Sequence, residues 1–327
     1  MTTANKAWGV AVCAASLLCG GISAAALAQE FPVKPVRFIV PFPPGGTVDP
    51  LARLIGAKLN AALGQQFIVD NRTGGSGIIG TDIAAKANPD GYTYVFVFDT
   101  HAVNPSLMPN LPFDTQKDLA PVMLVGRAPY GIITHPAKPY KTMTDLVKVA
   151  KAKPDTVTYG TVGAGSLGHL ALTLVGQAGG FKIVHVPYKG GGPMTVAVMG
   201  GQIDMGIGST ALVTPFVSDG RMRALATTGD ARAATLPNVP TLLEEGYKGV
   251  TAYAWWGIFT TARTPPLILK KFHGEVVKVL NQPDVRKHLG EQLGMDLVVS
   301  SPEELRLWTA NELARWGRVI RDNNIKP

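Results

Sequence analysis

Strand-like and helix-like segments alternate along most of this chain, and glycine-rich turns separate them. In the first unit, the apolar run at 36–40 predicts a buried strand, and the leucine spacing within 51–59 predicts a helix. The segment 41–50 between them reads Pro-Phe-Pro-Pro-Gly-Gly-Thr-Val-Asp-Pro. Asp49 followed by Pro50 matches a helix cap with proline at the first helical position. Asp49 is therefore predicted to be a structural cap.

The turn at 41–50 also has the features of an anion site. Its two glycines allow a sharp bend that exposes backbone N–H groups, and the following helix presents its positive end. An ordinary strand-to-helix connection without a ligand remains the alternative, because glycine is common in such connections.

Similar units follow along the chain. Glycine-rich loops at 71–77 and 160–166 each lie between a predicted strand and a predicted helix. This alternation predicts an α/β protein with a parallel sheet that is covered on both faces. The strands are expected at 65–70, 92–98, 122–125, 131–134, 157–159, 181–186, 203–207, 223–227 and 255–259, and the later helices at 78–87, 143–153, 167–176, 194–199, 267–280 and 303–321.

The order of these units predicts two lobes. One α/β series precedes residue 125, a second follows residue 134, and a late strand returns near 254–261. We therefore expect lobe 1 to comprise 29–127 and 258–327, and lobe 2 to comprise 128–257. Ligands of open α/β sheets bind beyond the carboxyl ends of the strands, where the glycine-rich loops of both lobes are expected to face a cleft.

The N-terminus has the features of an export signal. Lys6 precedes an apolar run at 9–26, and Ala26-Leu27-Ala28 is a small-x-small cleavage motif. We expect cleavage after Ala28 and a periplasmic mature protein, with a retained membrane anchor as the alternative. Cys13 and Cys19 both lie in this leader, so the mature chain has no cysteine for disulfides or thiolate chemistry.

Charge and motif spacing disfavour several classes of protein. The net charge is +8, or +7 without the leader, and no block of basic residues interleaves with aromatic ones, so nucleic acid is not an expected partner. The pattern G-x-G-x-x-G occurs at 75–80 and 163–168, but the acid that would bind a ribose is missing after the second copy, and only Asp99 matches it after the first. The histidine spacing matches no metal motif. We expect no cofactor and no metal.

Catalysis is also not expected. Ser166, His169 and Asp204 are a possible hydrolase set, but no G-x-S-x-G motif is present, and Ser166 matches the N-cap of the helix that starts at Leu167. An exported hydrolase that uses Ser166 and His169 remains an alternative function.

The segment 35–53, with P-F-P-P-G-G-x-x-D-x-x-A-R, resembles the opening of the extracytoplasmic solute-binding receptors of tripartite tricarboxylate transporters, the Bug-type receptors. Segments similar to theirs recur in the same order at 71–75, 88–92, 168–170, 186–190, 201–204 and 236–241. The resemblance implies a two-lobed periplasmic-binding-protein fold of type II (a Venus flytrap). It implies capture of a small organic carboxylate. The ligand is a monocarboxylate or a dicarboxylate, and aromatic acids are among the candidates. Delivery to membrane transporter subunits is implied as well, or signalling as a ligand-sensing receptor. We expect a monomer.

The resemblance also implies a set of ligand-binding residues. In the first lobe these are Phe42, Gly45, Gly46, Thr47, Ser76, Thr100 and His101, and in the second they are Thr161, Gly165, Ser166, His169, Tyr188 and Ser209. Two positions depart from the family pattern: Gly208-Ser209-Thr210 stands where an Asp is common, and Thr73 where Pro is usual. Because that negative charge is absent, our hypothesis is that the pocket is wider or that it admits a second carboxylate.

Overall fold

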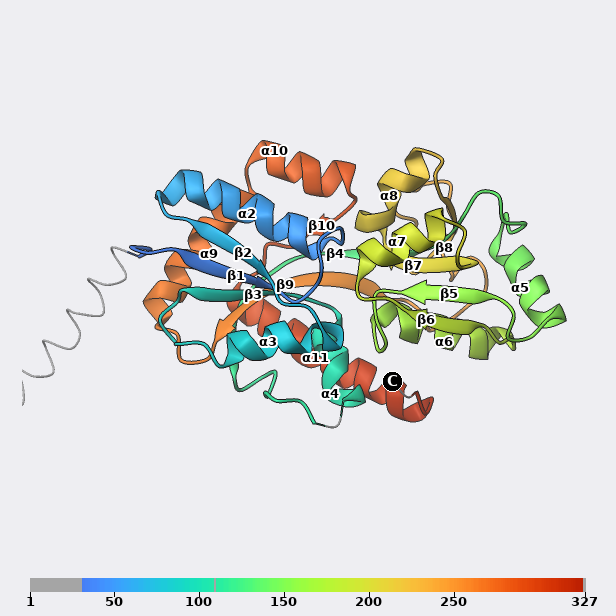
Figure 1. Cartoon of the computed structure of the whole chain (residues 1–327), viewed down its shortest axis with the longest axis horizontal. Coiled ribbons are helices and arrows are strands. Elements are labelled where there is room, and N and C mark those ends of the chain that lie inside the picture. Colours follow the sequence, from blue (N-terminus) through green and yellow to red (C-terminus); the bar gives the residue numbers. More distant parts are fainter. Residues whose placement is uncertain (1–30, 109, 326–327) are drawn as a thin grey trace, which may run out of the picture.

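The computed structural model describes residues 31–108 and 110–325, so the expected export signal lies outside the described residues. The elements form two groups that lie side by side, and two long strands run from one group into the other (Figure 1). These strands are β4 (Leu119–Thr134) and β9 (Tyr253–Thr261), which pair antiparallel with each other.

The first group is built on the N-terminal strands. Strands β1, β2 and β3 are parallel, and β9 continues the sheet antiparallel to β3. Helices cover both faces of this sheet (Figure 1). Its elements are β1 (Val36–Val40), α2 (Val48–Leu63), β2 (Phe67–Asn71), η1 (Gly75–Gly77), α3 (Ile78–Ala85), β3 (Thr93–Phe98), α4 (Thr100–Leu107), α9 (Pro266–Leu280), α10 (Pro283–Arg286), η2 (Lys287–Gln292), β10 (Asp296–Leu297) and α11 (Pro302–Asp322).

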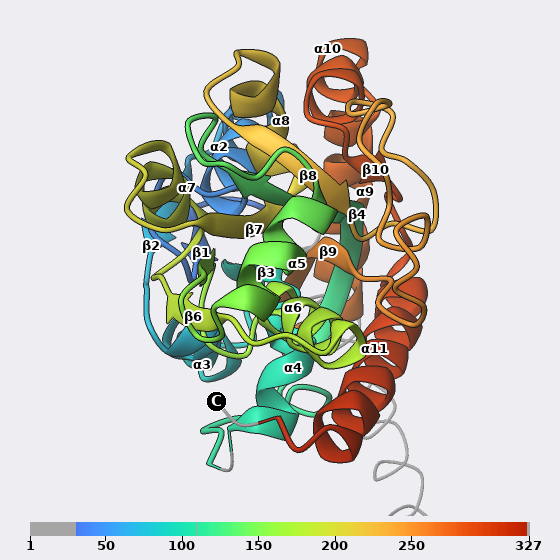
Figure 2. The ribbon, with the colours of Figure 1, turned by 90° about the vertical axis from the view of Figure 1, so that its right-hand side faces the viewer.

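The second group is built on the far end of β4. From residue 130 onward β4 pairs antiparallel with β7 and β8, and β7 leads on to the parallel strands β5 and β6. This group stands in front in the end-on view of Figure 2. Its elements are α5 (Met143–Ala152), β5 (Thr158–Thr161), α6 (Leu167–Gly179), β6 (Val184–Pro187), α7 (Gly191–Met199), β7 (Met205–Ser209), α8 (Thr210–Ser218) and β8 (Arg223–Thr227).

Two expectations about the strands are wrong. The sheet is mixed and not parallel, because β9 and β4 enter it antiparallel. The strands expected at 122–125 and 131–134 are one continuous strand, β4, despite the prolines at 121 and 129. Proline cannot donate to a ladder. The β4–β9 register shifts just after Pro121, and such an irregularity accommodates the missing N–H group.

Helices α4 and α8 are absent from the sequence prediction. Each contains a proline, Pro105 and Pro215 respectively, which weakens the helical pattern. The other expected helices and strands are present, with ends that differ by a few residues.

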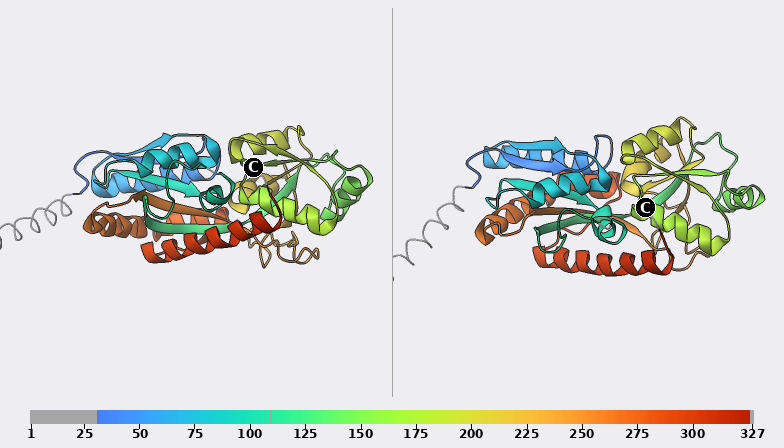
Figure 3. Two further views of the ribbon diagram at one scale, coloured as in Figure 1. Left: turned by 90° about the horizontal axis from the view of Figure 1, so that it is seen from below. Right: turned by 60° about the horizontal axis from the view of Figure 1, so that its bottom comes forward.

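Alternating side chains of the strands build the core on the two faces of the sheet. Phe38 and Trp256 belong to one apolar cluster, whereas their neighbours Ile39 and Trp255 belong to another. Helix α11 runs along one side of the molecule (Figure 3) and packs on α4 and β4, with Trp316 buried. Within residues 31–108 and 110–325, no helix has the length and apolar character that crossing a bilayer requires.

Candidate ligand-binding site

The loop that follows β1, residues 41–47, is fixed at both ends; we call it the ligand loop. Near its start, the ring of Phe42 packs edge-on against Phe98, with ring centroids 6.1 Å apart. At its end, the Trp256 indole N–H donates to the Thr47 hydroxyl over 3.0 Å. Gly45 has φ +90°, a conformation that favours glycine.

The predicted cap at Asp49 is wrong. Helix α2 begins at Val48 with Thr47 as its N-cap residue, so Asp49 lies inside the first turn. Its carboxylate instead accepts from the Arg53 Nε at 3.0 Å and from the Asn71 Nδ2 at 2.9 Å. Pro50 fits because the amides of the first turn have no partner within the helix.

A small cavity lies between the two groups of elements, beside the ligand loop. Three helices begin at its wall: the N-cap residues of α2, α7 and α8 are Thr47, Gly190 and Ser209, and all three line the cavity. None of the three helices has a hydrogen bond from a capping side chain. The residues that line this cavity are Phe42, Gly46, Thr47, Val48, Phe98, Val162, Gly190, Gly191, Ser209 and Leu212, none of which is charged.

Three uncapped helix N-termini at one cavity favour an anion. The N–H groups of a first helical turn lack intrahelical partners, and the helix dipole places partial positive charge there. With no carboxylate among the lining residues, nothing in the wall competes for these groups. The apolar side chains of Phe98 and Leu212 add a surface that suits a hydrocarbon body.

A second, larger cavity shares Phe42 and Val162 with the first, because both residues line both cavities. Ser76 and Tyr188 line it, and Lys189 is the one charged residue among its lining. The Ser76 hydroxyl donates to the Ala164 carbonyl over 2.8 Å, which joins the first group of elements to the second.

The predicted residues of the second group lie mostly behind the cavity wall. Ser166 is fully buried, and its hydroxyl accepts the His169 backbone N–H at 3.3 Å as the N-cap of α6, as predicted. The Gly165 N–H donates to the His169 Nδ1 over 3.2 Å, and Thr161 Oγ1 donates to the Gly163 carbonyl over 2.9 Å. These bonds shape the loop that carries Val162 into both cavities.

A hydrolase site is not formed by this arrangement. The Ser166 hydroxyl caps a helix in a fully buried position, and the His169 imidazole holds the backbone of Gly165. The His169 ring also stacks on His185, with centroids 4.0 Å apart, and burial lowers the pKa of both imidazoles, that of His185 to about 4. In the described part of the chain, His, Cys, Asp and Glu residues form no group of three or more that could hold a metal ion.

His101 lies apart from the other predicted residues. Its ring packs against Phe259 at a centroid distance of 4.9 Å and near Trp255, inside an apolar cluster. This burial lowers the pKa of His101 to about 3, so the imidazole is neutral. Its neighbour Thr100 is also buried, and its hydroxyl lies close to Gly77, which lines the second cavity.

The structure therefore brings Phe42, Gly46, Thr47 and Ser209 to the first cavity and Ser76 and Tyr188 to the second. Gly45 packs against Gly192 of the second group. Sequence reasoning missed Phe98, Val162, Gly190, Gly191 and Leu212. The glycine run at 190–192 repeats the strand–glycine–helix pattern of the ligand loop, so that signal was available. Phe98 and Leu212 carry no such signal, because apolar residues in strands and helices usually serve the core.

Known proteins resemble this chain along nearly its whole length. Residues 51–325 match the family model described as "Tripartite tricarboxylate transporter family receptor". Protein BugT of Bordetella pertussis is 35% identical over 308 residues, which cover 94% of each chain.

Two solved structures have the same fold. The periplasmic binding protein BugD has a TM-score of 0.86 at 29% identity, with 90% of this chain and 99% of that one covered. The R. palustris protein Rpa4515, solved with adipate, has a TM-score of 0.87 at 32% identity, with 91% of this chain and 99% of that one covered.

Proposed function

This chain belongs to the tripartite tricarboxylate transporter receptor family of Bug-type proteins, and on that basis we propose that it captures a small organic carboxylate between its two groups of elements and delivers it to the membrane subunits of a transporter. Family membership makes the chain a solute-binding receptor and not an enzyme. Receptors of this family are periplasmic binding proteins. Removal of a signal peptide after Ala28 would bring this chain to the same compartment.

The convergence of three helix N-termini on one uncharged cavity carries the proposal. A carboxylate there would accept hydrogen bonds from the backbone of Gly46, Thr47 and Gly191, and from the hydroxyl of Ser209. Hydrogen bonds to a charged group each contribute roughly 1.5–3 kcal/mol, so a few of them provide ordinary receptor affinity. The adipate bound by the relative Rpa4515 is a ligand of this chemical class.

The second cavity provides room for the remainder of the ligand. It shares Phe42 and Val162 with the first cavity and is also lined by Tyr188 and Lys189, and a cation there suits a second carboxylate. The segment Gly208-Ser209-Thr210, where the family commonly has an Asp, adds no negative charge that would oppose a second carboxylate. Calorimetry with adipate and with hexanoate, which has the same chain length, tests this hypothesis. Equal affinity for the two acids would count against a second carboxylate.

We assign residues 29–127 with 258–327 to lobe 1 and residues 128–257 to lobe 2. The pairing of β4 supports this division, because its partner changes from β9 to β7 between Pro129 and Tyr130. The lobes would close on the ligand through a change in the twist of β4 and β9, and the ligand would favour the closed state by binding it more tightly.

A thermal-shift screen of organic acids tests the function. The panel includes adipate, aliphatic monocarboxylates and aromatic acids, and each acid is paired with its neutral amide. When the free concentration of a binding acid is 100 times its Kd, binding stabilises the folded state by about 2.7 kcal/mol. We expect at least one acid to raise the Tm and its amide to leave the Tm unchanged. Stabilisation by no acid, or equally by the amide, would contradict carboxylate binding.

Transport and signalling are distinguished in cells. Deletion of the gene is expected to abolish uptake of the radiolabelled acid that the screen identifies. Intact uptake with a lost transcriptional response to that acid would favour a signalling receptor.

Light scattering of the purified protein tests the expected monomer.

A further inference from the structure

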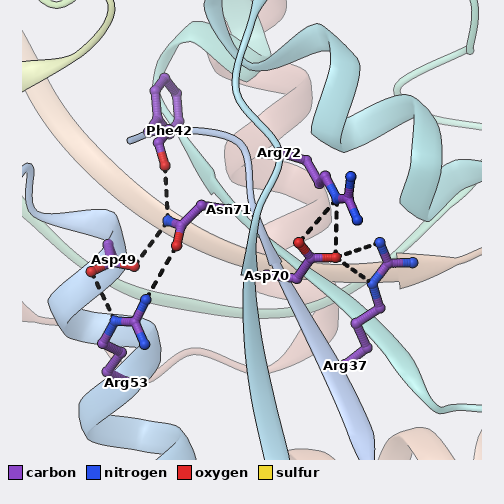
Figure 4. Close-up of polar contacts among 7 residues, drawn as sticks. All are labelled: Arg37, Phe42, Asp49, Arg53, Asp70, Asn71 and Arg72. Atoms are coloured by element: carbon purple, nitrogen blue, oxygen red, sulfur yellow. Dashed lines mark hydrogen bonds and ion pairs between the residues drawn. The ribbon is translucent and has the colours of Figure 1, made fainter. Parts of the chain in front are cut away.

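We propose that Asn71 is a positioning residue for the ligand loop: its amide holds the backbone of Phe42, and Asp49 with Arg53 holds the amide (Figure 4). The role of Asn71 in ordering the ligand loop is argued from geometry alone. Its effect on the affinity for a carboxylate rests on the proposed function.

Asn71 is the last residue of β2, next to the end of β1 where the ligand loop starts. Its Nδ2 donates to the Phe42 carbonyl over 3.0 Å and to the Asp49 Oδ1 over 2.9 Å. Its Oδ1 accepts from the Arg53 Nη2 at 3.2 Å, and the Arg53 Nε donates to the Asp49 Oδ2 over 3.0 Å. The four residues thus form one closed network from β2 through the loop to the first two turns of α2.

Only a carboxamide satisfies all three partners of Asn71. The Phe42 carbonyl and the Asp49 carboxylate each need a donor, and the Arg53 guanidinium needs an acceptor. A carboxylate at position 71 would face another carboxylate and a carbonyl oxygen. Asp49 is largely buried, with a side chain that is 9% exposed, so a lost partner leaves a poorly solvated charge.

The network matters to binding because it orders the loop before the ligand arrives. Asn71 fixes the loop at Phe42 and Trp256 fixes it at Thr47, with only the segment 43–46 between the two anchors. Two of those four residues are glycines, which are the most mobile residues when unrestrained. A loop that is already ordered in the free protein loses little conformational entropy on binding.

The preceding residue of β2 is a matched control. The Asp70 carboxylate accepts from the Arg37 Nε at 2.8 Å and from the Arg72 Nε at 3.1 Å. Successive side chains of a strand point to opposite faces, and in Figure 4 this cluster is separate from the Asn71 network. Substitution of Asp70 therefore removes charged hydrogen bonds from the same strand without affecting an anchor of the ligand loop.

Hydrogen exchange of the ligand-free protein tests the positioning role directly. Asn71→Ala is expected to speed amide exchange in the segment 41–50 about tenfold or more, because the loop opens locally. Asp70→Ala is expected to leave exchange in that segment unchanged. Equal exchange in Asn71→Ala and wild type would overturn the inference. Asn71→Leu, which is similar in shape and adds no charge beside Asp49, replaces Asn71→Ala if that variant fails to fold.

Affinity for adipate, measured by calorimetry, tests the consequence for binding. We expect Asn71→Ala to bind adipate about tenfold more weakly, with Asp70→Ala binding like wild type. The exchanged pair Asn71→Asp with Asp49→Asn restores an amide–carboxylate contact but leaves the Phe42 carbonyl without a donor. It is expected to recover thermal stability and not affinity, whereas a merely structural role predicts recovery of both. Failure of the wild type to bind adipate would count against the proposed function with this acid, and the exchange data would still decide the role of Asn71.

Discussion

Two buried titratable residues that lie two positions apart have pKa values shifted in opposite directions. Asp99 is completely buried at the end of β3, and this burial raises its pKa to about 8 although the Tyr130 hydroxyl donates to it. His101 is buried without a charged partner, and its pKa falls to about 3. Both residues are therefore neutral at pH 7, which is the state that an apolar interior favours.

Asp99→Asn is predicted to flatten the pH dependence of stability between pH 6.5 and 8. The folded-state pKa of about 8 lies above the unfolded value of about 3.9, so between them the folded state binds more protons and stability falls as pH rises. His101 and His185 have lowered pKa values, and they contribute the opposite slope only below about pH 6.5. Glu312, whose pKa burial also raises, remains in both proteins. Urea unfolding across this pH range measures the slope, and an unchanged slope would show that Asp99 does not titrate there.

At the scale of elements, the helices begin in two ways. Helices α5, α6 and α11 have side-chain caps from Thr142, Ser166 and Ser301. Helices α2, α7 and α8 have none, and these three begin at the cavity; α3, α4, α9 and α10 also lack a side-chain cap but begin elsewhere. A side-chain cap satisfies the amides that an anion would otherwise bind. Helix α6, which lies behind the cavity wall, therefore has a side-chain cap. The helices that begin at the cavity have first-turn N–H groups without such a cap.

Ser166→Ala is predicted to lower the free energy of unfolding by about 1 kcal/mol, the usual contribution of an N-cap hydroxyl. Ser301→Ala, which removes the equivalent cap of α11 far from the cavity, is the matched control and is expected to have a similar effect. Because Ser166 lines neither cavity, we expect the affinity for the acid that the thermal-shift screen identifies to stay within about twofold of wild type in both variants. A larger loss in Ser166→Ala alone would place the hydroxyl in contact with the ligand.

The sequence predicted elements whose signals are local and missed those that depend on distant partners. Strand β1, the ligand loop and α2 follow from adjacent residues, as does the cap at Ser166. The continuity of β4 through Pro121 and Pro129 depends on β9, which lies far along the chain.

Site prediction has the same limit. Thr100 and His101 are adjacent in sequence, but tertiary packing turns the imidazole into the apolar core, and no local pattern encodes that direction. Asp49 matched a cap by residue type, yet its carboxylate is used by Asn71 and Arg53.

The whole molecule, as described, has its two groups of elements in contact. Gly45 of the ligand loop packs against Gly192 at the start of α7, and Ser76 bonds the Ala164 carbonyl across the same boundary. A Cβ atom on Gly192 would lie 3.0 Å from the Gly45 carbonyl carbon and 3.1 Å from the Pro44 oxygen. These are backbone atoms, which cannot move aside as a flexible side chain would.

Gly192→Ala is predicted to impede closure without harming the fold. Alanine favours a helix more than glycine does by about 1 kcal/mol, so the Tm is expected to be unchanged or higher. Affinity for the acid that the thermal-shift screen identifies is expected to fall about tenfold. Wild type is expected to become more compact with that acid in X-ray scattering, and the variant less so. Gly274→Ala in α9 is the control, because a Cβ atom there meets nothing within 4 Å. Wild-type affinity in Gly192→Ala would exclude this contact from the closed state.

The crossing of β9 between the two groups has a consequence for how the nascent chain folds. Strand β3 lies between β1 and β9, but ribosomes synthesise β9 only after every element of the second group. Until then β3 exposes an unpaired edge, which other chains can use as a template for aggregation. The second group, by contrast, pairs β4 to β8 within one contiguous stretch. The half of the protein that is made first is therefore completed last, and the edge of β3 stays open until β9 has been made.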